Sequence, residues 1–83
     1  MEIIEGSVRY KRGRKQKDGS RIYIIRYSTG LEDKEIRIKE EIDTDASFHS
    51  KDSIEIINPR NGTGLITIKN LNLETSITGN RVF

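Results

Sequence analysis

Isoleucine dominates the apolar residues of this chain and limits the folds that can bury them. Of the 83 residues 14 are isoleucine, against four leucines, two valines and one alanine. β-Branched side chains pack well on a pleated sheet and lose rotamer freedom in a helix. The balance therefore predicts an all-β chain.

The chain is long enough for one small core. With no cysteine and one histidine, it lacks the usual ligands for a disulfide or zinc staple. We therefore expect residues 1–83 to form a single domain held together by packing. No segment has the roughly 20 apolar residues of a membrane span or the apolar region of a secretory signal. We expect a cytoplasmic protein with no membrane partner.

A first hairpin is predicted where residues 2–12 and 21–28 flank Asp18-Gly19. Asp-Gly favours a two-residue type I′ turn because both positions adopt positive φ. In this register Tyr10 lies opposite Tyr27. One face then carries Val8, Tyr10, Tyr23, Ile25 and Tyr27, with Arg12 and Arg14 toward the tip, and the other carries Arg9, Lys11, Lys15, Ile22, Ile24 and Arg26. A β-bulge at Gly13 would move the residues beyond it to the opposite face.

The next segment predicts a third strand and a loop. Residues 34–39 alternate, so Ile36 and Ile38 are expected to face inward and Glu35, Arg37 and Lys39 outward. Residues 40–51 show no sustained period and are rich in Asp, Ser and Thr. They predict a loop with at most one helical turn, attached to the core by Ile42 and Phe48.

A second hairpin is predicted from residues 53–58 and 64–69. A two-residue turn at Asn61-Gly62 would put the isoleucines of the two strands on opposite faces. A loop over residues 59–63 instead puts Ile56 opposite Ile66 and Ile54 opposite Ile68, and leaves Pro59 outside the ladder. Burial of the isoleucine row favours the loop.

The C-terminal segment completes the predicted sheet. Alternation of Leu71, Leu73 and Ile77 indicates one more strand or an extended tail, with a turn at Gly79-Asn80. Five or six short antiparallel strands avoid unpaired edges if the sheet closes. We predict a closed or half-closed SH3-like or OB-like barrel, with a flat antiparallel meander as the alternative.

Charge is distributed unevenly along the chain. The net charge is +2, but residues 8–27 contain eight cations and one acid, whereas residues 31–57 contain nine acids and four cations. We expect one basic pole on the first hairpin and one acidic flank.

The basic hairpin is the strongest candidate for a functional site. Cations on both faces suit contacts with phosphates, arginine forks suit guanine edges, and interleaved tyrosines suit stacking on unpaired bases. Alternatively, the tyrosines pack the hairpin base and the charges keep a protruding edge soluble, or the cations bind an acidic protein. The candidate nucleic-acid-binding residues are Arg9, Lys11, Arg12, Arg14, Lys15, Lys17, Arg21, Tyr23 and Arg26.

Two further clusters argue against enzymatic chemistry. The acids Glu40, Glu41, Asp43 and Asp45 suggest a metal site or an acid/base pair. Asp43, Asp45 and Ser47 match the first three ligand positions of a calcium loop, but the match fails because Phe48 and Ile54 stand where Gly and Glu are required. The residues Ser47, His49 and Asp52 contain the types of a hydrolase triad but share one short loop without a supporting scaffold. We therefore expect a non-enzyme with no metal, cofactor or small-molecule substrate.

Residues 6–13, Gly-Ser-Val-Arg-Tyr-Lys-Arg-Gly, are followed by Asp-Gly-Ser-Arg-Ile-Tyr-Ile-Ile-Arg-Tyr at 18–27. Together they resemble the opening hairpin of the three-stranded arm-type DNA-binding domain found in front of many tyrosine recombinases. The sheet of that family docks on DNA, so the resemblance implies a DNA contact for this hairpin. Two features depart from the family: acidic residues 40–47 replace the helix after the third strand, and the second isoleucine hairpin has no counterpart.

The sequence thus predicts a small nucleic-acid-binding protein, for DNA or RNA, that contacts phosphates through residues 9–26. If about five cations neutralise phosphates, a plot of the logarithm of the binding constant against the logarithm of the salt concentration has a slope near −4.5. Affinity then falls roughly 500-fold between 50 and 200 mM salt. The alternative is a non-enzymatic interaction or assembly module, viral or plasmid-encoded, that uses an exposed strand edge to bind a partner or to form a homo-oligomer.

Overall fold

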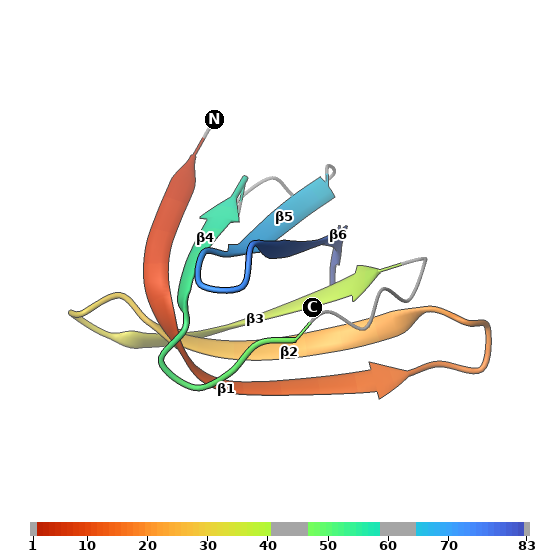
Figure 1. Ribbon diagram of the computed structural model, residues 1–83. Coiled ribbons are helices and arrows are strands. Elements are labelled where there is room, and N and C mark those ends of the chain that lie inside the picture. The colour runs from red at the N-terminus through yellow and green to blue at the C-terminus, as the bar shows by residue number, and fades with distance from the viewer. Residues whose placement is uncertain (1, 41–46, 59–64, 83) are drawn as a thin grey trace.

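The computed structural model describes residues 2–40, 47–58 and 65–82. They form six strands: β1 (Ile3–Lys15), β2 (Arg21–Ser28), β3 (Asp33–Glu40), β4 (Ser53–Ile57), β5 (Leu65–Asn70) and β6 (Thr75–Arg81). All the strand pairs are antiparallel, in the order β1-β2-β3-β6-β5-β4, and β4 pairs with β1 to close the ring (Figure 1). The predicted small all-β barrel is confirmed.

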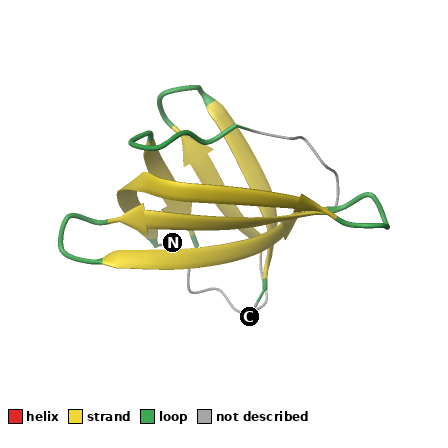
Figure 2. Ribbon diagram, turned by 90° about the horizontal axis from the view of Figure 1, so that it is seen from below, coloured by secondary structure: helices red, strands yellow, loops and turns green. Residues whose placement is uncertain are grey.

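Strand β1 is long enough to pair with two different strands, β4 along its first part and β2 along its second. Its residues 3–7 pair with β4 and its residues 7–15 pair with β2. The strand bends between these two parts, as Figure 1 shows, and the pairing with β2 carries a bulge between Val8 and Tyr10. Bulges increase local twist and bend a strand. The long hairpin of β1 and β2 therefore extends to one side of the ring (Figure 2).

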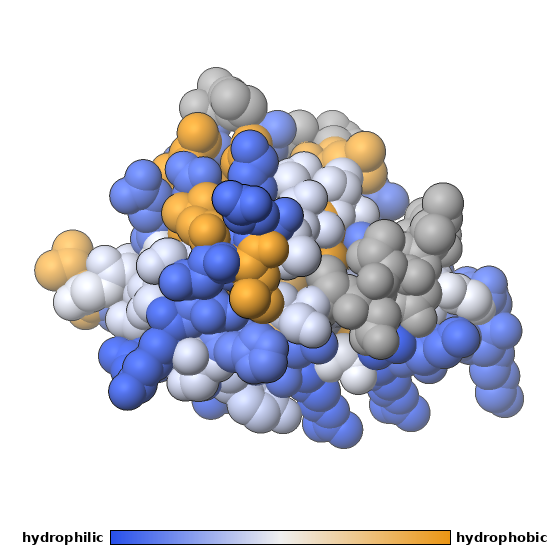
Figure 3. Space-filling view, in the orientation of Figure 1, coloured by the Kyte–Doolittle hydropathy of each residue, from blue (hydrophilic) through white to orange (hydrophobic). Residues whose placement is uncertain are grey.

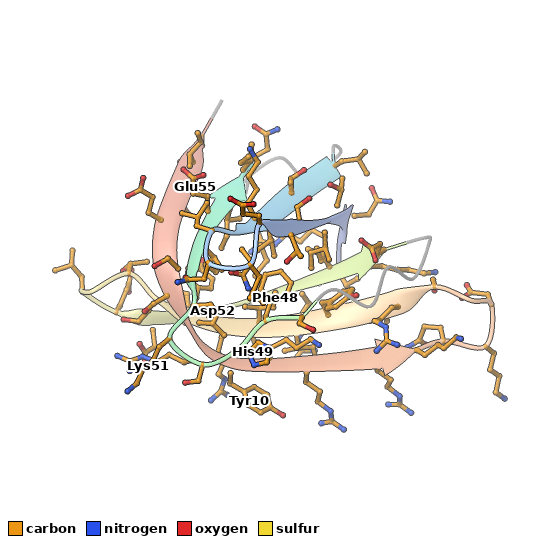
Figure 4. The ribbon with its side chains drawn as sticks, viewed as in Figure 1. Tyr10, Phe48, His49, Lys51, Asp52 and Glu55 are labelled. Atoms are coloured by element: carbon orange, nitrogen blue, oxygen red, sulfur yellow. The ribbon has the colours of Figure 1, made fainter. Side chains whose placement is uncertain are left out.

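The core consists of side chains from the inner faces of the strands. Ile36 and Ile38 are 3% and 0% exposed, as their alternation predicted. Phe48, from the segment before β4, is also buried and lies inside the ring, as predicted (Figure 4). Ile42 lies outside the described residues. The buried apolar side chains are Val8, Tyr23, Ile25, Tyr27, Ile36, Ile38, Phe48, Ile54, Ile56, Ile66, Ile68 and Ile77.

Strands β4 and β5 bury their isoleucines on one face, as predicted, but in another register. Ile56 lies opposite Ile68, and Ile54 lies opposite Asn70. The prediction paired Ile56 with Ile66 and Ile54 with Ile68, so the predicted register is wrong by two residues. A shift of two keeps every side chain on its own face, so hydrophobic burial did not distinguish the two registers. The predicted loop residues 59–63 lie outside the described residues.

The C-terminal segment differs from the prediction in two places. Residues 71–74 form a turn, and Leu71 and Leu73 are exposed there instead of continuing a strand. The buried side chain of Asn70 causes this turn, because its Oδ1 accepts hydrogen bonds from the amides of residues 72 and 73. The predicted turn at Gly79-Asn80 is also wrong, because both residues lie within β6.

Candidate nucleic-acid interface

The first hairpin turns over five residues, 16–20, instead of the predicted two. The amide of Gln16 donates to the Ser20 carbonyl at 2.8 Å, and the amide of Gly19 donates to the Gln16 carbonyl at 3.2 Å. Asp18 Oδ1 accepts hydrogen bonds from both the amide and the hydroxyl of Ser20, at 3.0 and 2.6 Å. This side-chain turn replaces the expected type I′ turn. Lys15 therefore pairs with Arg21, one residue away from the predicted register.

Because the observed register differs from the predicted one by one residue, residues 10–15 of β1 lie on the opposite face from the one predicted. Arg12 lies opposite Ile24 and Arg14 opposite Ile22, on the outside of the barrel. The prediction that these arginines share a face with Tyr23 and Ile25 is wrong. Lys11 and Lys15, expected beside Ile22 and Ile24, instead lie opposite Ile25 and Arg21.

The bulge lies at Arg9, and Gly13, the position considered for a bulge, pairs regularly with Tyr23. Val8 before the bulge is 1% exposed and faces the core, whereas Tyr10 after it is 52% exposed and lies opposite Arg26. Figure 4 shows Tyr10 pointing away from the barrel, on the other side of β1 from Phe48. The predicted pairing of Tyr10 with Tyr27 on a core-facing surface is therefore wrong.

The hairpin does not form a two-stranded ribbon on its own. Strand β3 pairs with β2 over its whole length, from Asp33 opposite Ser28 to Glu40 opposite Arg21. Three cross-strand rows therefore lie side by side on the outside of β1, β2 and β3. We call their nine residues the outer face: Tyr10, Arg26 and Glu35; Arg12, Ile24 and Arg37; Arg14, Ile22 and Lys39.

Glu35 is the one acid among the nine residues of the outer face. Its carboxylate accepts hydrogen bonds from Arg37 Nε at 2.8 Å and from Arg26 Nε at 3.3 Å. These two bonds, first that of Arg37, hold the pKa of Glu35 below its usual value. One carboxylate thus neutralises only part of the charge of two guanidinium groups.

Other ion pairs join the basic and acidic segments at the rim of the outer face. Lys39 Nζ lies 3.5 Å from Asp18 Oδ2, and Arg9 Nε lies 3.8 Å from Asp33 Oδ1. The predicted separation into a basic pole and an acidic flank therefore holds only in part, since β3 brings acids alongside the hairpin.

Four candidate cations keep their charge free near the hairpin tip. Arg12, Arg14, Lys15 and Lys17 are exposed, and no carboxylate of the described residues lies within ion-pair distance of any of them. Hydrophilic side chains gather along this side of the molecule in Figure 3. These cations are available to an anionic ligand.

Of the five other candidates, Arg9 and Arg26 form the ion pairs described above, and the remaining three are less accessible. Tyr23 is 0% exposed and belongs to the core, so it cannot stack on a base in this structure. The ammonium group of Lys11 lies 5.6 Å from the centre of the Tyr23 ring, a cation–π distance. Arg21 is half-buried and faces Glu40 across the sheet.

The structure adds Arg37 and Lys39 to the candidate site. In the sequence both residues belong to the acidic segment 31–57, although their alternation predicts that they point outward. The hydrophobic pattern does not reveal that β3 pairs with β2. This pairing places Arg37 opposite Ile24 and Lys39 opposite Ile22. Tyr10 also joins the site, because the bulge turns it outward.

Two open depressions meet at Tyr10. The larger, about 530 Å³, is lined by Arg9, Tyr10, Arg26, Asp33, Lys34 and Glu35. The second, about 460 Å³, is lined by Tyr10, Arg12, Ile24, Arg26, Glu35 and Arg37. Both combine an aromatic ring with guanidinium groups and open directly to solvent.

The segment containing Ser47, His49 and Asp52 is hydrogen-bonded to β1 and β5. Asp52 Oδ2 accepts hydrogen bonds from Asn70 Nδ2 at 2.8 Å and from the amide of His49 at 2.9 Å. These bonds, first that of Asn70, lower the pKa of Asp52. Its backbone carbonyl accepts a hydrogen bond from Val8. Asp52 therefore orders the turn before β4.

The acidic cluster falls partly outside the described residues. Glu40 is buried, at 6% exposure, and residues 41–46 are not described. Within 2–40, 47–58 and 65–82, no group of three or more His, Cys, Asp or Glu side chains is placed to hold a metal ion.

Comparison with known proteins found no relative: no family model matches the chain, and neither does any curated protein or solved structure. The resemblance to arm-type DNA-binding domains gains no support from these comparisons, and the closed ring of six strands differs from their three-stranded sheet. Among the described residues, no helix is long and apolar enough to cross a membrane.

Proposed function

We propose that this protein binds nucleic acid through the outer face and the adjoining hairpin tip. The observation that supports this most is the group of four exposed cations, Arg12, Arg14, Lys15 and Lys17, which have no carboxylate partner among the described residues. Among the other cations of β1, β2 and β3, ion pairs with acids are formed by Arg9, Arg26, Lys34, Arg37 and Lys39. A group of unneutralised cations around one hairpin tip is the electrostatic feature of a polyanion-binding site.

Edge protection explains part of this charge but not all of it. Residues 10–15 of β1 pair with β2 and with no other described strand, and charged side chains on such an edge prevent unwanted pairing. That role requires neither an exposed Tyr10 nor an outward Ile24 between arginines. A ligand that offers both phosphates and bases would use all of these groups.

The first test is the salt dependence of binding, measured by fluorescence anisotropy of labelled oligonucleotides. Four phosphate contacts correspond to a slope of about −3.6 for a duplex and about −2.8 for a single strand. Affinity should then fall about 150-fold or about 50-fold, respectively, between 50 and 200 mM salt. A flat salt response, or no binding of any oligonucleotide at the lower salt concentration, would contradict the proposal.

A pair of double variants tests the location of the site. Arg12→Glu/Arg14→Glu should weaken binding at least about tenfold, because it reverses two phosphate-contacting charges. Lys51→Glu/Lys69→Glu changes the net charge equally, at exposed positions outside the outer face, and should weaken it less than about threefold. Equal losses in the two double variants would show that net charge, not this surface, governs binding.

The assembly alternative has one specific observation behind it, the edge of β1 over residues 10–15. An extended acidic segment of a partner could add a strand there. Light scattering distinguishes the two functions. A nucleic-acid-binding protein of this kind stays monomeric without ligand, whereas an edge-pairing module forms an oligomer that survives high salt.

A further inference from the structure

We propose that the nucleic acid bound is single-stranded, and that an unpaired base stacks on Tyr10, which lies at one corner of the outer face. This inference rests on the proposed function and specifies its ligand. It follows from the exposure of Tyr10, from the groups that surround its aromatic ring, and from the accessibility of base faces in a single strand but not in a duplex.

Tyr10 contributes little to the folded core. It is 52% exposed, whereas Tyr23 and Tyr27 are 0% and 4% exposed. The bulge at Arg9 produces this exposure, because in an unbroken ladder the residue two after buried Val8 would face the core. The bulge thus presents an aromatic ring to solvent, and bulges commonly reorient side chains beside functional sites.

The surroundings of the ring suit a stacked base. Arg26 lies opposite Tyr10 on β2, and Arg12 lies two residues along β1 on the same face. The half-buried Ile24 lies between Arg12 and Arg37 and supplies an apolar surface. Aromatic rings and guanidinium planes both stack on bases, and neighbouring cations follow the backbone of the strand. The two depressions that meet at Tyr10 leave room for this contact.

A duplex would leave these apolar groups unused. Its bases stack on one another and offer only their edges in the grooves, while its outer surface is phosphate and sugar.

The width of the outer face also favours a single strand over a duplex. A major groove admits a two-stranded ribbon, whereas β3 flanks β2 over the whole hairpin and makes the surface three strands wide. A single strand can lie across such a sheet with its bases turned onto it.

Intrinsic fluorescence provides a direct test in the unmodified protein. The chain has three tyrosines and no tryptophan, and Tyr10 is the exposed tyrosine. Unlabelled oligothymidylate and oligouridylate of about 12 nucleotides should quench the tyrosine emission on binding. A duplex of the same length should bind more weakly and leave the emission unchanged.

Variants assign the effect to the ring. Tyr10→Ala should weaken single-strand binding about 5- to 100-fold, the range expected when one base loses its stacking partner. Tyr10→Phe keeps the ring and should stay within about threefold of the parent protein. Leu71→Ala, at an exposed apolar residue in the turn between β5 and β6, should not change binding.

The outcomes separate the inference from the proposed function. If no oligonucleotide binds, the proposed function fails. If the duplex binds more tightly than the single strands, or if Tyr10→Ala changes binding no more than Leu71→Ala, the single-strand inference is wrong while the proposed function stands. If single-strand binding leaves the tyrosine emission of the parent protein unchanged, the stacking role of Tyr10 is wrong, whatever the variants do.

Discussion

Gly79 in β6 lies directly against the main chain of Lys39 in β3, so close that a Cβ atom at position 79 would overlap the Lys39 carbonyl group. This contact lies where β3 pairs with β6. Within the described residues, the β3–β6 ladder consists of two residue pairs, Ile38 with Arg81 and Lys39 with Asn80, and the amide of Val82 donates to the Arg37 carbonyl at 2.9 Å. The close approach of the two main chains therefore requires glycine at this position.

Gly79→Ala should lower the free energy of unfolding by about 2 to 3 kcal/mol, because the added methyl group forces the β3–β6 pair apart. Gly13→Ala is the matched control. Its Cβ would meet the end of the Arg21 side chain, which can move away, so it should change stability by less than about 0.5 kcal/mol. Urea denaturation measures both. Equal effects would show that closure does not depend on Gly79.

Asn70 joins three segments of the barrel through one buried side chain. Its Nδ2 donates to the Ser47 carbonyl and to Asp52 Oδ2, and its Oδ1 accepts from two amides of the β5–β6 turn. Asn70→Ala should lower the free energy of unfolding by about 3 kcal/mol, because it leaves buried polar groups unpaired. Asn80→Ala, at an exposed position, should cost much less. Similar losses in thermal unfolding of the two variants would contradict this role.

The hairpin turn should lose stability in acid. Hydrogen bonds from the Ser20 side chain and amide, with a further contribution from Lys39, lower the pKa of Asp18 from 3.8 to about 2. Ionised Asp18 therefore stabilises the fold above about pH 4, and this contribution disappears as the pH falls toward 2. The melting temperature of the parent protein should exceed that of Asp18→Asn at pH 5, and the difference should shrink toward pH 2. A difference independent of pH would contradict this.

Glu35 restrains two arginines of the outer face, so its removal should strengthen binding. Glu35→Gln frees Arg26 and Arg37 from their carboxylate partner and should tighten single-strand binding about two- to fivefold at low salt. The gain should shrink at high salt because exposed charges are screened. Glu74→Gln makes the same charge change in the β5–β6 turn and should have no such effect. Weaker binding by Glu35→Gln would indicate that Glu35 itself contacts the ligand.

Hydrophobic alternation predicted which residues face the core of this protein. The inward positions of Ile36, Ile38 and the isoleucines of β4 and β5 follow from a period of two, because one face of each strand is buried. The same signal could not choose between registers that differ by two residues, and it placed Ile56 opposite the wrong isoleucine.

The outer face was harder to predict because it depends on local turn chemistry. The Asp18–Ser20 hydrogen bonds lengthened the turn and moved Arg12 and Arg14 to the other face. A bulge at Arg9, which has no glycine to mark it, turned Tyr10 outward. Neither feature changes the hydrophobic pattern of β2 or β3, so the core prediction succeeded while the assignment of the β1 faces failed.

We expect single-stranded nucleic acid to bind on the outer face. The most direct measurement is a ¹H–¹⁵N correlation spectrum of the labelled protein, recorded while unlabelled oligothymidylate is added. We expect the largest amide shifts in β1, β2 and β3 around Tyr10, Arg12, Ile24 and Arg37, with little change in β4 and β5. Shifts concentrated in β4 and β5, or a spectrum that does not change at saturating oligonucleotide, would contradict the claim.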